Sequence, residues 1–103
     1  MRTIVKHIVM WKLLEFADGN SKEDNAIKMK KMLESLKTNI KEVKSLEVGI
    51  NLIPSSSAYD IVLSIQFDNF EDLKIYLSHQ EHIKVSDFIT KIRENRIIVD
   101  YEV

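Results

Sequence analysis

Four stretches of the chain carry apolar residues in alternation or in short β-branched runs, and each pattern predicts a β-strand. The predicted strands span residues 3–14, 44–52, 59–67 and 96–101. In the second of them, Leu46, Val48 and Ile50 alternate with polar or small residues, as in a strand with one buried face. Gly49 within this strand indicates a bulge or a close approach of two backbones.

Between the first two strands, apolar residues recur with a period of about 3.6, which predicts an amphipathic helix. A turn at 18–21 precedes this helix, and Ser21 with Asp24 resembles a capping box. The apolar stripe consists of Met29, Met32, Leu33, Leu36 and Ile40. The lysines between these positions are predicted to form a solvated face rather than a nucleic-acid-binding stripe.

A second helical region follows the third strand, and Asp68 or Asn69 can cap its start. Its first part carries Tyr76 on an apolar stripe, and a break is predicted near 78–79. The part after the break has a longer stripe formed by His82, Val85, Phe88, Ile89 and Ile92. The pattern therefore predicts two consecutive helical pieces before the last strand.

The order of these elements is βαββαβ, the ferredoxin-like α+β pattern of an antiparallel sheet with its helices on one face. A length of 103 residues suits one small domain with one core, so residues 1–103 are predicted to form a single domain. The stretch at 53–57 is rich in proline and serine and is predicted to be a surface loop.

The first and last predicted strands are apolar on both faces. In the first strand Ile8 and Met10 lie on one face, while Val9 and Trp11 lie on the other. Helices on one side leave the second face exposed, and soluble monomers avoid large exposed apolar patches. We therefore predict a homodimer in which two sheets pack into an α+β barrel about a two-fold axis. If the helices cover the Ile8 face, the face that carries His7 lines the interior of that barrel.

Composition excludes several classes of protein. The net charge of −1, from 15 basic and 16 acidic residues, favours neither nucleic acid nor a membrane as a partner. The chain has no cysteine, which excludes disulfides, thiol nucleophiles and cysteine-rich zinc sites. No apolar run approaches the roughly 20 residues of a membrane-spanning helix, and the N-terminal segment lacks the pattern of a signal peptide. A cytoplasmic location is the expectation.

The candidate chemistry lies in the three histidines and one tyrosine. His7 sits in the apolar first strand, while His79 and His82 follow Tyr76 closely. An imidazole has a pKa near neutrality, so a buried cluster of imidazoles and a phenol can move protons. His82 is predicted to point inward, either as a base or as a histidine that a backbone carbonyl or Tyr76 satisfies. His79 is expected to cap a helix or face solvent, and two imidazoles alone are a poor metal site, so no metal is predicted.

The ordered set of motifs in this chain resembles the stress-responsive dimeric α/β-barrel (Dabb) domain family. The segments that carry the resemblance are 5–13, 45–49, 59–61, the His79-x-x-His82 region and 98–101. Together they span essentially the whole chain. The resemblance implies ferredoxin-like protomers whose sheets pair into a barrel in a homodimer, in agreement with the two-sided strands.

The family includes a plant polyketide cyclase that closes olivetolic acid by an aldol reaction. That resemblance implies a catalytic base at His82 and a phenol at Tyr76 that holds the substrate. It places His7 in the same cavity and matches His79 to the first histidine of the motif. The family commonly has proline after that histidine, whereas this chain has Gln80.

We therefore predict a mainly apolar cavity that binds a small hydrophobic or aromatic molecule. Its candidate lining is His7, Val9, Trp11, Tyr76, His79, His82, Val85 and Phe88. Cofactor-independent proton transfer of the cyclase or lyase type is the first hypothesis for its chemistry. A non-catalytic, stress-linked module for dimerisation and ligand binding is the second. A monooxygenase-like dimeric barrel is a third and weaker one, to which Trp11 alone points.

Overall fold

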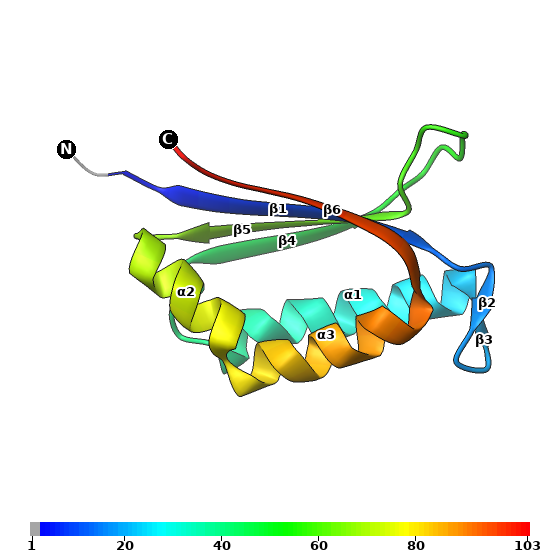
Figure 1. The fold of residues 1–103 in the computed structure, drawn as a ribbon, viewed down its shortest axis with the longest axis horizontal. Helices are drawn as coiled ribbons and strands as arrows, with labels where there is room; N and C mark the ends of the chain where they lie inside the picture. The colour runs from blue at the N-terminus through cyan, green and yellow to red at the C-terminus, as the bar shows by residue number, and fades with distance from the viewer. Residues whose placement is uncertain (1–2) are drawn as a thin grey trace.

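A four-stranded antiparallel sheet forms one layer of the fold in the computed structural model, which describes residues 3–103 (Figure 1). Its strands lie in the order β4-β5-β1-β6. They are β1 (Val5–Leu13), β4 (Ser45–Ile50), β5 (Ile61–Phe67) and β6 (Arg93–Glu102). The predicted ferredoxin-like α+β order is confirmed for the protomer. The last strand begins three residues earlier than predicted, because Leu13 pairs with Arg93 beyond an irregularity in the β1–β6 ladder.

Three helices form the second layer, on one side of the sheet (Figure 1). They are α1 (Lys22–Asn39), α2 (Phe70–Ser78) and α3 (Gln80–Ile92). The Oγ atom of Ser21 accepts a hydrogen bond from the backbone N of Asp24 at 3.2 Å, so the expected cap of α1 is present. Asn69 caps α2 in the same way. The predicted break separates α2 from α3 at His79.

The turn predicted at 18–21 is part of a small hairpin between β2 (Phe16–Ala17) and β3 (Asn20–Ser21). Asp18 and Gly19 at its tip have φ angles of 51° and 79°. Two residues with positive φ are the pattern of a type I′ turn, whose twist suits a tight hairpin. The hairpin had no signal in the apolar pattern because its strands are only two residues long.

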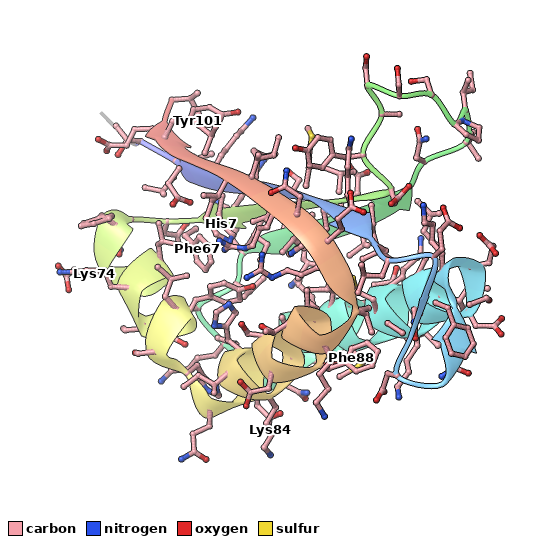
Figure 2. All side chains as sticks on the ribbon, turned by 45° about the vertical axis from the view of Figure 1, so that its right-hand side comes forward. His7, Phe67, Lys74, Lys84, Phe88 and Tyr101 are labelled. Carbon is pink, nitrogen blue, oxygen red and sulfur yellow. The ribbon has the colours of Figure 1, made fainter. Side chains whose placement is uncertain are left out.

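The helices cover the face of β1 that carries His7, which reverses the assignment considered from the sequence. Val5, His7, Val9 and Trp11 are all buried, and Figure 2 shows His7 and Phe67 between the sheet and the helices. Strand β5 decides the orientation because only one of its faces is apolar along its whole length. The register places Leu63 opposite Val9 on that face, so the apolar side chains of both strands pack against the helices together.

The opposite face of the sheet has no covering element among residues 3–103 (Figure 1). Its apolar side chains are partly exposed, with Met10 at 37%, Ile97 at 45% and Val99 at 59%. The loop between β4 and β5 rises on this same side (Figure 1). Near the start of that loop, Leu52 is 91% exposed and Ile53 is 78% exposed. The protomer therefore leaves apolar surface of the sheet itself in water on this side.

Gly49 makes the close approach predicted for it, without a bulge. Strands β4 and β5 pair without a register shift, and Gly49 lies opposite Val62. A Cβ atom on Gly49 would lie 3.2 Å from Cγ1 of Val62. The glycine thus leaves room for a β-branched neighbour on the uncovered face.

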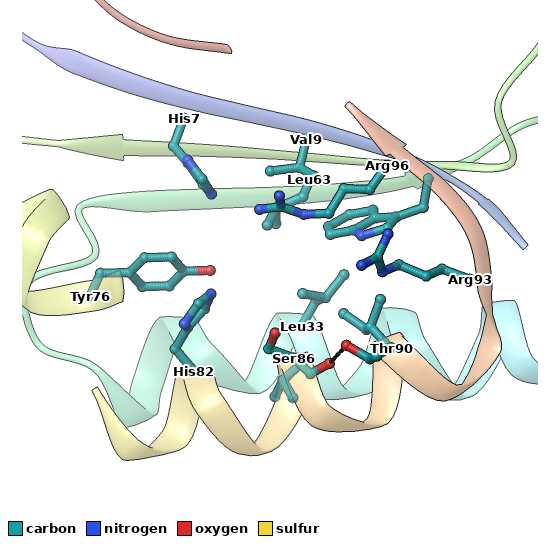
Figure 3. A pocket seen from close by; sticks show the side chains of 13 residues that line it. His7, Val9, Leu33, Leu63, Tyr76, His82, Ser86, Thr90, Arg93 and Arg96 are labelled. Atoms are coloured by element: carbon teal, nitrogen blue, oxygen red, sulfur yellow. Dashed lines mark hydrogen bonds between the residues drawn. The ribbon is translucent and has the colours of Figure 1, made fainter. Parts of the chain in front are cut away.

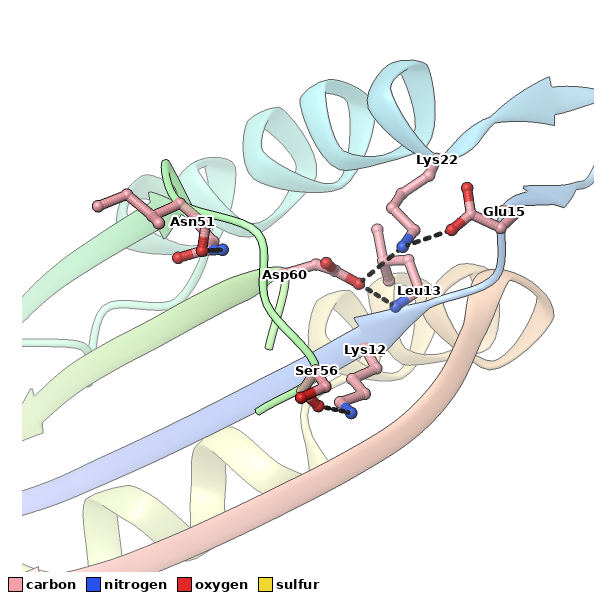
Figure 4. A network of polar contacts seen from close by, with 8 residues as sticks. Lys12, Leu13, Glu15, Lys22, Asn51, Ser56 and Asp60 are labelled. Atoms are coloured by element: carbon pink, nitrogen blue, oxygen red, sulfur yellow. Dashed lines mark hydrogen bonds and ion pairs between the residues drawn. The ribbon is translucent and has the colours of Figure 1, made fainter. Parts of the chain in front are cut away.

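A polar network ties the end of β1 to the start of α1 (Figure 4). The backbone N of Leu13 donates to Oδ2 of Asp60 at 2.8 Å. The Nζ atom of Lys22 lies 3.5 Å from the same oxygen and 3.1 Å from Oε1 of Glu15. These contacts join Asp60 to the end of β1 and the start of α1, which are distant from it in sequence. No helix in the described part of the chain is long and apolar enough to span a membrane, and the cytoplasmic location stays a prediction.

Candidate functional site

A cavity of about 210 Å³ lies between the sheet and the helices (Figure 3). Strand β1 contributes His7, Val9 and Trp11 to its wall, α2 contributes Tyr76, and α3 contributes His82 and Val85. The structure thus brings six of the eight predicted lining residues together. The cavity lies inside the protomer rather than between two sheets, because the His7 face of β1 meets the helices.

His82 presents an unprotonated nitrogen to the cavity. Its Nδ1 atom lies 3.1 Å from the carbonyl oxygen of Leu77. A carbonyl only accepts, so Nδ1 carries the proton and Nε2 of the neutral ring is an acceptor. Burial lowers the pKa of His82, against the opposing effect of the Leu77 hydrogen bond, and the nearby charges of His7 and Arg96 lower it further. The imidazole is therefore neutral at pH 7 and able to take up a proton.

Tyr76 lies beside His82 with its hydroxyl toward the cavity (Figure 3). The two ring centroids are 4.5 Å apart, and the Tyr76 ring also packs 5.3 Å from that of Phe67. The residue is 1% exposed, and its hydroxyl has no hydrogen-bond partner among residues 3–103. Burial raises the pKa of Tyr76 well above its ordinary value. The phenol is therefore protonated at neutral pH and available as a hydrogen-bond donor.

His7 completes the cluster from the sheet side. Its ring centroid lies 5.7 Å from that of Tyr76. The Nδ1 atom donates to Oδ1 of Asp100 at 2.5 Å, which leaves Nε2 directed into the cavity. Burial lowers the pKa of His7, and the Asp100 hydrogen bond and charge act in the opposite direction. Two imidazole Nε2 atoms and one phenol hydroxyl thus face a common space (Figure 3).

Two arginines that the sequence analysis did not single out also line the cavity. Arg93 and Arg96 extend into it from the start of β6 (Figure 3). Ser86 and Thr90 of α3 line it too and are exposed, so the cavity opens to solvent between α3 and β6. The expectation of a mainly apolar cavity is therefore wrong. Residues 96 and 100 are an even number of positions apart in the strand, so their side chains lie on the same face. Only the β1–β6 register shows that this is the face toward the cavity.

The comparisons with known proteins agree with this architecture. The model of the stress-responsive A/B barrel domain family, Dabb, matches residues 5–103. The chain belongs to the Dabb family. A dimeric protein of unknown function and ferredoxin-like fold from Bacteroides fragilis is 34% identical to this Dabb chain. The match covers 97% of this chain and 96% of that chain, with a TM-score of 0.82.

More distant solved structures share the fold of this Dabb domain. A dimeric ferredoxin-like protein of unknown function from Thermobifida fusca is 19% identical, with 100% of this chain and 93% of that chain covered and a TM-score of 0.83. The hydroxynitrile lyase from Passiflora edulis is 15% identical, with 97% and 93% covered and a TM-score of 0.81. Among curated proteins, no relative matches this chain.

The two remaining residues of the predicted lining, His79 and Phe88, do not line the cavity. His79 caps α3, because its Nδ1 atom accepts from the backbone N of Glu81 at 3.1 Å. Gln80 is the first residue of α3, the position that proline favours in helices, so the exchange of the family's proline for glutamine leaves the helix start in place. Phe88 packs in the core, with the Nζ atom of Lys28 4.5 Å from its ring centroid. Within residues 3–103, no group of three or more His, Asp or Glu side chains forms a metal-binding cluster.

Proposed function

We propose that this Dabb domain binds a small carbonyl compound in the cavity and catalyses proton transfer without a cofactor. One observation carries this proposal: the His82 imidazole and the Tyr76 hydroxyl face the same cavity, with ring centroids 4.5 Å apart. A base and a hydrogen-bond donor at this spacing can act on one molecule at once. Val9, Leu63 and Val85 supply an apolar wall for a hydrocarbon or aromatic part of that molecule.

The proposed reaction begins at a C–H bond next to the carbonyl. Nε2 of His82 takes up that proton, and the electron pair of the C–H bond forms an enolate. The Tyr76 hydroxyl donates a hydrogen bond to the enolate oxygen, where negative charge develops. In an aldol-type closure the enolate carbon then bonds to a second carbonyl carbon of the same molecule. The new alkoxide recovers the proton from His82, so the base returns to its neutral form.

The electrostatics of the site support these roles. Burial holds the pKa of His82 below its ordinary value, so the ring is a free base at pH 7. Burial also raises the pKa of Tyr76, so the phenol keeps the proton that it must donate in a hydrogen bond. The passionfruit hydroxynitrile lyase shows that the same fold hosts a lyase.

The proposal includes a homodimer. The Bacteroides relative at 34% identity is described as dimeric, which supports the same state for this chain. The uncovered face of the sheet supplies the apolar surface that a partner would bury, chiefly at Met10, Ile97 and Val99. Sheet-to-sheet packing of two copies would leave each cavity on the helix side of its own protomer.

The test is deuterium exchange at carbon, followed by proton NMR in D2O. A panel of small ketones and β-dicarbonyl compounds is incubated with the wild-type protein. We expect exchange above the buffer rate, and a loss of about a hundredfold or more in His82→Gln, the scale of general-base catalysis. His79→Asn is the matched control, because it removes an imidazole outside the cavity and keeps a good capping side chain. Exchange that survives in His82→Gln would refute the role of His82.

A non-catalytic binding module is the second candidate, and one observation favours it. Both inward histidines are held through Nδ1, His82 by a backbone carbonyl and His7 by a carboxylate, as structural histidines are. This alternative predicts no exchange above buffer in the wild-type protein. It also predicts that His82→Gln lowers thermal stability and changes nothing else.

A further inference from the structure

Three hydrogen-bond donors meet at the β6 end of the cavity. Arg93 and Arg96 line it there, and the register of the sheet places Trp11 directly opposite Arg96. Figure 3 shows both arginine side chains entering the cavity from the β6 side, with their guanidinium groups turned toward the side where Tyr76 and His82 lie. The cavity therefore combines imidazoles and a phenol on one side with guanidinium groups that enter it from the other.

No carboxylate neutralises these arginines. Among residues 3–103 neither guanidinium forms an ion pair, and no acidic side chain lines the cavity. The carboxylate of Asp100, on the same strand β6, is already hydrogen-bonded to His7. The positive charge of Arg96 acts on the other polar groups of the site and lowers the pKa of both His7 and His82. The cavity thus presents uncompensated positive charge to whatever enters it.

Trp11 supplies a second and independent sign of a missing partner. The residue is 4% exposed, and its Nε1 atom is buried without a hydrogen-bond partner in the described structure. Buried N–H groups are nearly always paired, because an unpaired donor costs free energy. Since Trp11 lines the cavity, an acceptor atom of a ligand can satisfy this donor.

We propose that the ligand carries a carboxylate, which Arg93, Arg96 and the Trp11 indole N–H bind together. A carboxylate is planar and matches the fork of a guanidinium group, and its two oxygens leave room for a third donor. The cavity volume of about 210 Å³ is below the roughly 300–1,000 Å³ of drug-sized pockets, so the ligand is small. The ligand is therefore assigned as a small oxo acid. Its carbonyl points toward His82 and Tyr76, and this part of the assignment rests on the proposed function.

This arrangement couples the binding of the ligand to the pKa of His82. A carboxylate beside Arg96 offsets the positive charge that lowers the pKa of His82. The imidazole then holds a proton more readily once the ligand is bound, which strengthens it as a base in the complex. A neutral analogue of the same shape would not offset that charge and so would not raise the pKa of His82.

The single tryptophan of the chain makes a direct test possible. Benzoate and pyruvate are titrated into the 15N-labelled protein, each beside its neutral amide, and the one indole N–H signal is followed by NMR. We expect a saturable shift with each carboxylate and none with either amide. Equal shifts with acids and amides, or no shift with any of the four, would overturn the assignment.

Charge variants locate the binding. Arg93→Gln and Arg96→Gln are each expected to weaken carboxylate binding about tenfold, the scale of a lost charge-assisted hydrogen bond. Lys91→Gln is the matched control, because it removes one positive charge from an exposed position of α3 outside the cavity. Equal losses in all three variants would indicate a general charge effect and contradict a built site.

The two proposals fail in different ways. Binding of benzoate that survives in His82→Gln, in a protein without carbon exchange, would uphold the carboxylate site and refute the proposed chemistry. Exchange of neutral ketones that depends on His82, without selectivity of the indole signal for acids, would uphold the chemistry and refute the carboxylate site.

Discussion

The Nδ1 atom of His7 lies 2.5 Å from Oδ1 of Asp100, and this contact joins the buried centre of the sheet to its edge strand. The side chain of His7 is 1% exposed, whereas that of Asp100 is 35% exposed. A partly exposed carboxylate thus holds an almost fully buried imidazole. It also fixes the tautomer in which Nε2 of His7 faces the cavity.

The first prediction concerns this pair. Asp100→Asn keeps an acceptor for Nδ1 of His7 and removes the negative charge. We expect the pKa of His7 to fall further, because burial and the charge of Arg96 then act with less opposition. Titration of the histidine ring signals by NMR measures the change, with Asp87→Asn on the exposed face of α3 as the control. An unchanged or higher pKa would show that the charge of Asp100 does not reach the ring.

The second prediction is the dependence of stability on pH. His7 and His82 have lowered pKa values in the folded protein, while in the unfolded chain each returns to about 6.5. As the pH falls through 6.5, the two histidines bind protons in the unfolded chain but not yet in the folded protein. The free energy of unfolding therefore falls with pH below about 6.5, down to the lowered pKa values. Urea denaturation at several pH values between about 5 and 8 measures this change, because that range includes the pKa of the unfolded histidines.

The variant His82→Gln sharpens that measurement. It removes one of the two lowered groups, so its stability should decline less steeply below pH 6.5 than that of the wild-type protein. A wild-type stability that rises on acidification would contradict the assigned direction of both shifts.

The third prediction concerns the Tyr76 hydroxyl. Tyr76→Phe should change the free energy of unfolding by less than about 1 kcal/mol, because the hydroxyl has no protein partner among the described residues. Carbon exchange under the proposed function should fall about a hundredfold, as on removal of an oxyanion donor. Tyr76→Ala, in contrast, should lose about 3–5 kcal/mol through the cavity that it creates in the core. A large loss of stability in Tyr76→Phe would assign the hydroxyl a structural role instead.

The fourth prediction concerns the uncovered face of the sheet. Wild-type protein should elute as a dimer in size-exclusion chromatography with light scattering. Val99→Lys places a charge on the exposed apolar face, where Val99 is 59% exposed in the protomer, and should give a folded monomer. Ile83→Lys is the control, since Ile83 is 46% exposed on α3 and should leave the dimer intact. A dimer that persists in Val99→Lys would place the interface elsewhere.

Much of the fold was predictable because its signals are local. The apolar period of α3 predicted that His82 and Val85 share the inward stripe, and both line the cavity. The break before α3 was predictable from the polar residues around His79, which caps the helix. The boundary of β6 was not, since Arg93 joins the strand only through its pairing with Leu13.

The polar end of the cavity escaped prediction for a related reason. Arg93 and Arg96 look like ordinary surface residues in the sequence, and Asp100 like a polar position in an apolar strand. Their place in the site depends on the β1–β6 register, which pairs Asp100 with His7 across 93 positions of the chain. A pattern read along one strand contains no information about the strand beside it.

By itself, the sequence determined the order of strands and helices, the helix break and the inward positions of Tyr76 and His82. Each of these follows from the spacing of apolar residues over one or two turns of helix or a few residues of strand. Only the tertiary structure decided which face of β1 meets the helices, and hence that His7 enters the cavity inside the protomer. A strand that is apolar on both faces can be buried on either side, so its orientation is set by the neighbour, β5. Only one face of β5 is apolar along its whole length, and that face must be removed from water.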